Sequence, residues 1–423
     1  MSTLFYVTIA IFVVTYVIII SEKVHRTVIA MAGAMLMILL GVINQEQAIE
    51  GVDFNTLGLL IGMMMIVGIA KDCGMFQFVA IWASKVGKGK PLPIFILLGI
   101  ITAVFSAFLD NVTTVLLMVP VTFVIANNLK LDAMPYLIGT ILLSNIGGAA
   151  TLIGDPPNIL IGSAASLTFM DFIINMAPVS VFTFVVILGL LLLVYKKAFV
   201  ASPQAQKAIM KFDPKQAITD KPLLIKSLIV LAIVFVGFFT HNITHIEGAT
   251  IALSGAALLL LLTMNDPEDH LKDIEWTTIF FFIGLFILVA GLEHMGVIRM
   301  LAEYLLTLTG GDIAVTTITV LWGSAVFSAI VDNIPFVATM IPLIKEIGTI
   351  AGLPLGPLWW ALALGADFGG NATIIGASAN VVVCGMAEKH GRKISFLRYM
   401  KVALPMTAVS LVIATAYLYI FYL

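Results

Sequence analysis

Residues 106–120, SAFLDNVTTVLLMVP, recur 222 positions later as residues 328–342, SAIVDNIPFVATMIP, with seven identities in fifteen. Residues 144–158, SNIGGAATLIGDPPN, recur at the same offset as residues 366–380, ADFGGNATIIGASAN, again with seven identities. Shared apolar composition explains scattered leucine and isoleucine matches. It does not explain Asp-Asn, Gly-Gly and Thr-x-x-Gly matched at one fixed offset, so the chain is interpreted as an internal duplication.

The composition places this duplication in a membrane. Of the 423 residues, 61% are hydrophobic and 11% are charged, and the formal net charge is −2. A soluble domain carries about 25% charged residues, so a soluble enzyme, a nucleic-acid binder and a disordered protein are excluded. A polytopic membrane protein remains, because a surface that faces hydrocarbon needs no charge. The first residues, MSTLFYVTIAIFVV, lack the basic region of a signal peptide and are interpreted as a first span.

Each half contains an apolar stretch that does not fit one span. The stretch 92–127 is too long and is interrupted at Asp110. In the second half, the arm that follows Asp332 has only the eleven apolar residues 334–344 before Lys345. Eleven helical residues rise about 16 Å, against a hydrocarbon core of about 30 Å. We therefore expect each unit to be a hairpin that enters and leaves by the same face.

The basic residues test this arrangement. With five spans and one hairpin in each half, the halves have opposite orientations, and twenty of the twenty-two Lys and Arg share one side. If each hairpin is counted as a single span, the split is twelve to ten. The positive-inside rule favours the first arrangement. The predicted fold is all-α and polytopic, with inverted repeats at 1–200 and 223–423 and a cytoplasmic linker at 201–222. It has about ten transmembrane helices, two re-entrant hairpins, two broken helices and both termini outside.

Four aspartates interrupt the apolar stretches: Asp110, Asp155, Asp332 and Asp367. A charged Asp at the bilayer centre costs about 2.5–3.5 kcal/mol on insertion scales, so these side chains must be protonated, hydrogen-bonded or in contact with water. No Lys or Arg is near them in sequence. Asp110 and Asp332 are repeat mates and are expected to bind substrate or ion, a role compatible with capping the following helix.

Helix-breaking residues cluster beside these acids. Breaks inside a span are tolerated where they line a cavity, and inverted-repeat transporters bind substrate and ions at such breaks. The alternative interpretation is ordinary helix packing. The predicted hinge positions are Gly147, Gly148, Gly154, Pro156, Pro157, Gly369, Gly370 and Gly376. Besides the four aspartates, the predicted binding side chains are Asn111, Thr113, Thr114, Asn145, Thr151, Asn158, Asn333, Asn371, Thr373, Ser378 and Asn380.

Other chemistries lack their motifs. The chain has no GxxxxGK[ST], no HExxH and no cysteine–histidine cluster with metal-ligand spacing. The YD and GxGD motifs of intramembrane aspartyl proteases are absent as well. We therefore expect no catalytic residue, no metal site and no cofactor, and the protein is not interpreted as an enzyme. Cys73 and Cys384 are interpreted as separate free thiols.

At FLDNVTTVLLMVP, NIGGAATLIGDPPN, VDNIPFVATMIPL and GGNATIIGASANVV the chain resembles the ion transporter superfamily. It is most similar there to the branch that holds arsenite permeases, NhaD-type sodium–proton antiporters and the melanosomal P-protein. Sister dicarboxylate carriers have Ser-Asn-Thr at the hairpin tips, where this chain has DNVT at 110–113 and DNIP at 332–335. The resemblance implies a transport domain of hairpins and broken helices that moves against a scaffold, in a homodimer.

The residues also indicate a substrate class. Asn, Thr and free backbone groups offer hydrogen bonds to a neutral hydroxide such as As(OH)₃, whereas no Lys or Arg is expected in the core to hold an anion. A site with three thiolates is impossible with two cysteines. We expect efflux of arsenite or antimonite across a bacterial or archaeal cell membrane, with H⁺ or Na⁺ as coupling ion. A sodium–proton antiporter, an organic-anion carrier and a channel are the alternatives, in that order. A soluble ATPase partner also stays open, and no nucleic acid is expected to bind.

Overall fold

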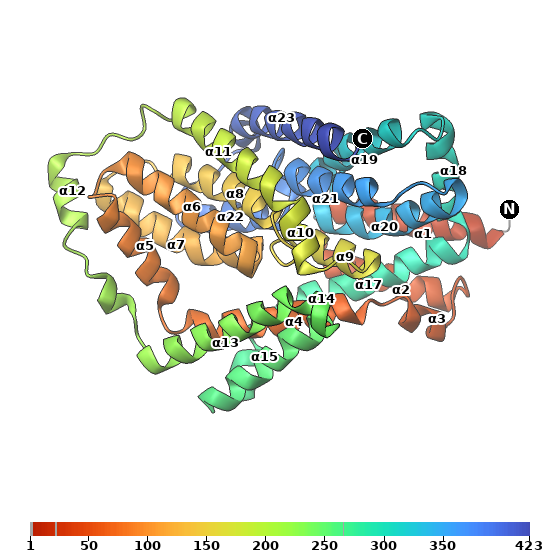
Figure 1. Cartoon of the computed structure of the whole chain (residues 1–423), viewed down its shortest axis with the longest axis horizontal. Helices are drawn as coiled ribbons and strands as arrows, with labels where there is room; N and C mark the ends of the chain where they lie inside the picture. The colour runs from red at the N-terminus through yellow and green to blue at the C-terminus, as the bar shows by residue number, and fades with distance from the viewer. Residues whose placement is uncertain (1–2, 22, 265) are drawn as a thin grey trace.

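The computed structural model describes residues 3–21, 23–264 and 266–423, which form 23 α-helices, two short 3₁₀ helices and no strand. Ten of these helices are long and apolar enough to cross a membrane. Figure 1 shows an elongated arrangement, with α12 (Pro203–Ile209) at one end and α18 (Val297–Thr309) near the N-terminus at the other. The predicted all-α membrane fold is confirmed.

The first repeat contains eleven helices. They are α1 (Thr3–Ser21), α2 (Arg26–Leu39), α3 (Gln45–Glu50), α4 (Phe54–Lys71), α5 (Met75–Val86), α6 (Pro91–Leu109), α7 (Asn111–Leu129), α8 (Met134–Gly148), α9 (Pro156–Ala165), α10 (Phe169–Asn175) and α11 (Ala177–Val194). The helix α12 and the 3₁₀ turn η1 (Pro214–Ala217) follow in the segment between the repeats.

The second repeat follows the order of the first, with two short elements added and one long C-terminal helix in place of α10 and α11. Its helices are α13 (Lys221–Phe239), α14 (His241–Thr244), α15 (Gly248–Thr263), α16 (Pro267–Leu271), α17 (Trp276–His294), α18, α19 (Ile313–Val331), α20 (Asn333–Ala351), α21 (Gly356–Gly370), η2 (Ile374–Gly376), α22 (Ser378–Lys389) and α23 (Phe396–Phe421). A shift of 222 residues carries both bounds of α6, α7 and α8 onto those of α19, α20 and α21. The duplication in the sequence is therefore a duplication of the fold.

The two hairpins are α6 with α7 and α19 with α20. In each, a single Asp joins two helices of 19 residues that pack against one another. Asp110 has φ +78° and Asp332 has φ +84°, a backbone region that side chains other than glycine rarely adopt. This conformation reverses the chain direction at the tip, so each pair of helices forms a hairpin rather than one continuous span.

The second arm of the second hairpin is longer than predicted. Helix α20 continues past the predicted end through Lys345 to Ala351, and its 19 residues are long enough to span. The exposed Lys345 does not end the helix because Ile344 and Ile347, on its other side, are buried. The predicted hairpin is present and follows from the turn at Asp332, but the predicted short arm is wrong.

Helices of both repeats form a scaffold beside the hairpins and broken helices. Helix α4 crosses α15, and α2 crosses α17. Both crossings depend on glycine, because a Cβ on Gly62 would lie 2.5 Å from the Ala252 backbone and one on Gly284 would lie 2.7 Å from the Ala30 backbone. Gly62 and Gly284 are repeat mates, as are Ala30 and Ala252. The scaffold thus interlocks helices of the two repeats.

Candidate functional site

The centre of the molecule is built from two hairpin tips and two helix breaks. Helix α8 stops at Gly148 and the chain resumes as α9 at Pro156, while α21 stops at Gly370 and the chain resumes as α22 at Ser378. The backbones meet closely at both breaks, since a Cβ on Gly148 would lie 2.5 Å from the Gly154 carbonyl oxygen, and one on Gly370 2.8 Å from that of Gly376. The predicted hinge residues therefore lie where the helices break.

Matching hydrogen bonds hold the two breaks. Asn158 donates to the carbonyl oxygens of Gly148 (3.4 Å) and Thr151 (3.1 Å). Its repeat mate Asn380 donates to those of Gly370 (2.8 Å) and Thr373 (2.9 Å). The hydroxyls of Thr151 and Thr373 donate to the hairpin carbonyls of Ala107 and Ala329. The two asparagines thus supply partners to backbone groups that a broken helix leaves without them, and the two threonines join each break to the neighbouring hairpin.

An amide and carboxylate network joins the two repeats. Asn111 donates to Asp155 and to the Oδ1 of Asn145 (3.1 Å), and Asn333 donates to the other oxygen of Asp155 (3.2 Å). Asn145 in turn donates to Asn371 and Asn380. Both hairpin tips thus contact one buried carboxylate. The structure brings these predicted residues together as one site.

Asp367 is the carboxylate with the fewest contacts. Its side chain is fully buried, and neither oxygen has a hydrogen bond of ordinary geometry within the described part of the chain, although Asn158 lies nearby. Asp155, which is 1% exposed, has Asp367 among its neighbouring acids. Buried carboxylates in one site cannot all stay ionised without a cation or protons, because the desolvation of each charge is costly and their repulsion adds to it.

The two hairpin-tip aspartates have different surroundings. The Oδ1 and Oδ2 of Asp110 accept from the backbone N–H (2.8 Å) and the hydroxyl (2.7 Å) of Thr113, which is the capping arrangement. The Oδ1 of Asp332 accepts from the Ile334 backbone N–H (3.1 Å). Its Oδ2 accepts from the Ser378 hydroxyl (2.8 Å) and pairs with Arg26. Thr114 also lies at the first tip, with a buried hydroxyl that has no hydrogen bond to described residues.

Arg26 corrects the expectation that no basic residue lies in the core. Its Nη1 is 3.0 Å from the Asp332 Oδ2 and 2.8 Å from the Ser378 hydroxyl. The sequence predicts a loop residue at this position because an apolar run follows it, but Arg26 is the first residue of α2. The first turn of the helix directs its guanidinium to the second hairpin, so the site does contain a fixed cation. The position that corresponds to Arg26 in the second repeat is Gly248.

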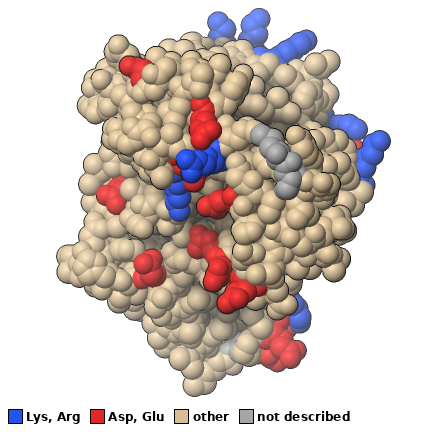
Figure 2. Space-filling view, turned by 90° about the vertical axis from the view of Figure 1, so that its right-hand side faces the viewer, with Lys and Arg blue, Asp and Glu red and all other residues tan. Residues whose placement is uncertain are grey.

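Arg26, Asp110 and Asp332 line one cavity of about 290 Å³. Glu275 and Ser378 line it as well, and the α1–α2 connection and the start of α17 form its rim. The cavity therefore opens toward the basic loops, on the side predicted to be cytoplasmic. Figure 2 shows the end of the molecule that lies near the N-terminus and α18, opposite to α12. Acidic side chains outline a hollow there, and a few basic side chains lie beside it.

Further contacts of the site were not predicted from the sequence. The Tyr16 hydroxyl of α1 lies 2.8 Å from the Pro335 carbonyl oxygen and 2.8 Å from the Thr339 hydroxyl, which ties the scaffold to the second hairpin. The hydroxyls of Ser106 and Ser328 donate to the carbonyl oxygens of Ser144 and Ala366 at equivalent positions. The matched positions of the two serines within the repeats are the signal in the sequence that could have found them.

A model of the family described as "Citrate transporter" matches residues 16–365. The chain belongs to the citrate transporter family. This membership agrees with the resemblance to the ion transporter superfamily, and it makes the chain a multi-pass integral membrane transporter rather than an enzyme.

Bacterial relatives of this family member are described as a membrane protein and as a transporter. A 46 kDa membrane protein of Mycobacterium leprae is 42% identical over 425 residues, which cover 99% of both chains. An uncharacterized transporter of Mycobacterium tuberculosis is 43% identical over 98% of each chain. The human P protein is 35% identical over 95% of this chain and 58% of its own length. These bacterial relatives agree with a cell-membrane location.

A solved structure supports the fold. The YdaH transporter of Alcanivorax borkumensis, described as having an unusual topology, superimposes with a TM-score of 0.58. The superposition covers 91% of this chain and 88% of the other, at 15% sequence identity. At this identity the likeness concerns the arrangement of helices, and the chemistry of the site comes from this chain's own residues.

Proposed function

We propose that this family member is a secondary active transporter driven by H⁺ or Na⁺, with the coupling cation bound by the central carboxylates. One observation carries the proposal: Asp155 and Asp367 are buried between the half-helix ends, and none of the ion pairs among the described residues includes either of them. Such groups must acquire a proton or a cation to stay buried, and they release it when water reaches them.

Amide oxygens complete the proposed cation site. The Oδ1 atoms of Asn111 and Asn158 are buried and have no hydrogen-bond partner among the described residues. Carboxylate and carbonyl oxygens are the donors that a hard cation such as Na⁺ takes in place of water. The orientation of these two amides at the same centre as Asp155 and Asp367 supports binding of a cation there, beside simple protonation of the acids.

The cavity beside this centre receives the transported solute in our proposal. For the solute we retain arsenite or antimonite as the neutral hydroxide. At the cavity, the hydroxyls of Thr278 and Ser378 and the carboxylates of Asp110 and Asp332 supply donors and acceptors for hydroxyl groups. Neither Cys73 nor Cys384 is among the residues that line it. Efflux follows if the solute binds in the cavity that opens toward the basic loops and leaves on the other side in exchange for the coupling ion.

A second candidate is an organic anion, and Arg26 is the observation that favours it. The guanidinium faces the cavity and can form two parallel hydrogen bonds to a carboxylate. Asp332 already occupies one of its N–H groups, so an anion would have to share or replace that contact. Sodium–proton exchange without another solute uses the same acids and is the third outcome that an experiment must separate.

Flux into proteoliposomes of the purified protein tests these proposals together. Under an imposed pH gradient, uptake of arsenite, ²²Na⁺ and radiolabelled citrate is compared with uptake into liposomes that contain Asp155→Asn protein. Gradient-dependent uptake of arsenite by the unmodified protein, and not by the Asp155→Asn protein, supports the first proposal. Uptake of citrate alone supports the anion carrier, and uptake of sodium alone supports the antiporter. Equal flux of any of them through Asp155→Asn protein would contradict the coupling role of the carboxylates.

A further inference from the structure

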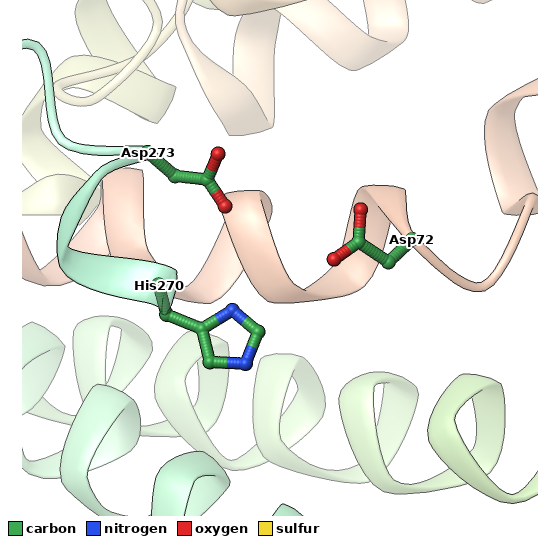
Figure 3. Close-up of side chains that lie close together, drawn as sticks. All are labelled: Asp72, His270 and Asp273. Carbon is green, nitrogen blue, oxygen red and sulfur yellow. The ribbon is translucent and has the colours of Figure 1, made fainter. Parts of the chain in front are cut away.

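A histidine and two aspartates meet outside the transport site, where α4 ends beside α16. Asp72 follows α4, and His270 and Asp273 belong to the turn of chain between α15 and α17. One potential ligand atom from each residue lies within 4.8 Å of the others. Figure 3 shows the imidazole and the two carboxylates around a common space between the two segments.

Local structure orients the two ligands of the second repeat. His270 and Asp273 are three residues apart in a helical turn, in which the Asp273 N–H donates to the His270 carbonyl oxygen (3.0 Å). Side chains at this spacing share one face of a helix. His270 is 5% exposed, so its ring is held in a fixed environment, while Asp72 is exposed and open to solvent ions.

A glycine on α4 makes room for Asp273. Gly68 lies one helical turn before Asp72, and a Cβ on Gly68 would lie 2.7 Å from the Asp273 Cβ. The repeat mates of these two residues, Ala290 and Gly51, make the same close approach, with a Cβ on Gly51 at 2.7 Å from the Ala290 Cβ. At the equivalent junction the glycine thus lies on the other segment, and no carboxylate takes the place of Asp273 there.

Comparison of the two junctions shows that the fold does not require the three side chains of this cluster. The repeat mates of Asp72, His270 and Asp273 are His294, Ala48 and Gly51, of which only His294 can bind a metal. The fold therefore packs this junction without a set of ligands. Asp273 takes the position that Gly51 has at the other junction, so a carboxylate lies where the fold needs only a small residue.

From this geometry we propose that Asp72, His270 and Asp273 bind a divalent transition-metal ion such as Zn²⁺, which fastens α4 of the first repeat to the α16 segment of the second. One imidazole and two carboxylates are the donor set that such ions accept, with a water as fourth ligand. The expectation of no metal site relied on spacing along the chain, which cannot detect ligands about 200 residues apart.

Lys71 shares the cluster and limits how the metal binds. Its ammonium group pairs with the Oδ1 of Asp273, which leaves the Oδ2 for the metal. The charges of Lys71, Asp72 and Asp273 sum to −1 with a neutral imidazole, so the site still attracts a cation. The Lys71–Asp273 pair alone would also hold α4 to the loop, and a test must therefore separate metal binding from this ion pair.

Zn²⁺ binding to the tag-free, full-length protein in detergent provides the test, by isothermal titration and by the Zn²⁺-dependent shift of thermal unfolding. Asp72→Asn removes a ligand that is exposed and is not part of the Lys71 pair. Asp269→Asn is the matched control, because it removes an exposed carboxylate from α16 that pairs with Lys272 instead. A variant of the buried His270 is avoided, because a loss of folding would be confounded with a loss of Zn²⁺ binding.

We expect the unmodified protein and Asp269→Asn protein to bind one Zn²⁺ in the micromolar range or tighter and to unfold at a higher temperature with Zn²⁺, since a ligand that binds only the folded state stabilises it. Asp72→Asn should weaken binding about tenfold or more and remove the shift. Absence of saturable binding to the unmodified protein would overturn the site. Equal affinity of the Asp72→Asn and unmodified proteins would overturn it as well, as would an equal loss in Asp269→Asn protein.

Discussion

The Nη1 of Arg26 lies 3.0 Å from the Oδ2 of Asp332, and this contact joins two parts of the molecule that are 306 residues apart in sequence. Arg26 begins the scaffold helix α2, whereas Asp332 is the tip of the second hairpin. Both side chains line the cavity. If the hairpin moves against the scaffold during transport, this pair breaks. We therefore expect it to couple the charge state of Asp332 to the position of the hairpin.

The coupling can be measured with a double-mutant cycle. Arg26→Ala should reduce the initial transport rate, because it leaves the partly buried Asp332 without its cation, and Arg26→Lys should restore part of the rate. In the double variant Arg26→Ala, Asp332→Asn, the loss of transport rate is expressed as an activation free energy. This loss should be smaller than the sum of the losses in the two single variants, by about 0.5–3 kcal/mol, as for residues in direct contact. Rates in proteoliposomes give the cycle, and additive effects would show that the pair does not act as a unit.

The acids at the two hairpin tips should determine the pH dependence of transport. Asp110→Asn and Asp332→Asn preserve volume and retain an oxygen that can cap the helix, but neither can release a proton. At least one of them should therefore flatten or displace the pH profile while the protein still inserts. Asp312→Asn is the control, because Asp312 caps α19 at an exposed position outside the cavity. Unchanged profiles in both tip variants would leave these residues as caps only.

The glycines at the helix breaks should be intolerant of a side chain. In Gly148→Ala the new Cβ would lie 2.5 Å from the Gly154 carbonyl oxygen, so the break must open, at a cost of about 1–3 kcal/mol. Gly189→Ala is the matched control, because nothing lies within 4 Å of its Cβ in α11, and it should be neutral or stabilising by about 0.5–1 kcal/mol. Thermal unfolding in detergent measures both, and an unchanged Gly148→Ala protein would contradict the packing described.

Particular residues show what the sequence could and could not predict. The spacing of 222 residues between matched Asp-Asn and Gly-Gly motifs predicted the hairpins, the breaks and the central asparagines, because polar residues duplicated within apolar runs are typical of inverted-repeat transport sites. The contact of Arg26 could not be predicted, since no pattern near it indicates a partner 306 positions away. The end of α20 was misplaced for a different reason, because a helix can continue past Lys345 when only one of its faces stays apolar.

The orientation of the repeats is a prediction that labelling can test. In a background with both native cysteines replaced by serine, single cysteines at the exposed Lys88 and Lys207 should react only after the membrane is permeabilised. A cysteine at the exposed Arg299 should react in intact cells, because α18 is predicted to lie on the outer side. Reaction of Lys88→Cys or Lys207→Cys protein with an impermeant reagent from outside would contradict the predicted orientation.

Recognition of arsenite by hydrogen bonds predicts that thiols are dispensable and amides are not. Cys73 is buried and bonds to the Ala70 carbonyl oxygen, and Cys384 lies on α22, far from it in sequence. Replacement of both cysteines with serine should therefore leave arsenite flux largely intact.

Asn111→Ala, Asn333→Ala and Asn371→Ala should instead weaken arsenite flux, because each removes a member of the network around Asp155 and Asn145. An unsatisfied partner in a buried site costs about 1–3 kcal/mol, or roughly a five- to hundredfold loss of affinity. Flux at several arsenite concentrations separates a loss of affinity from a loss of folded protein, for which the maximal rate at a fixed protein amount is the control. If the cysteine-free protein loses arsenite flux while the asparagine variants keep it, arsenite is bound by sulfur, and the proposed mode of recognition is wrong.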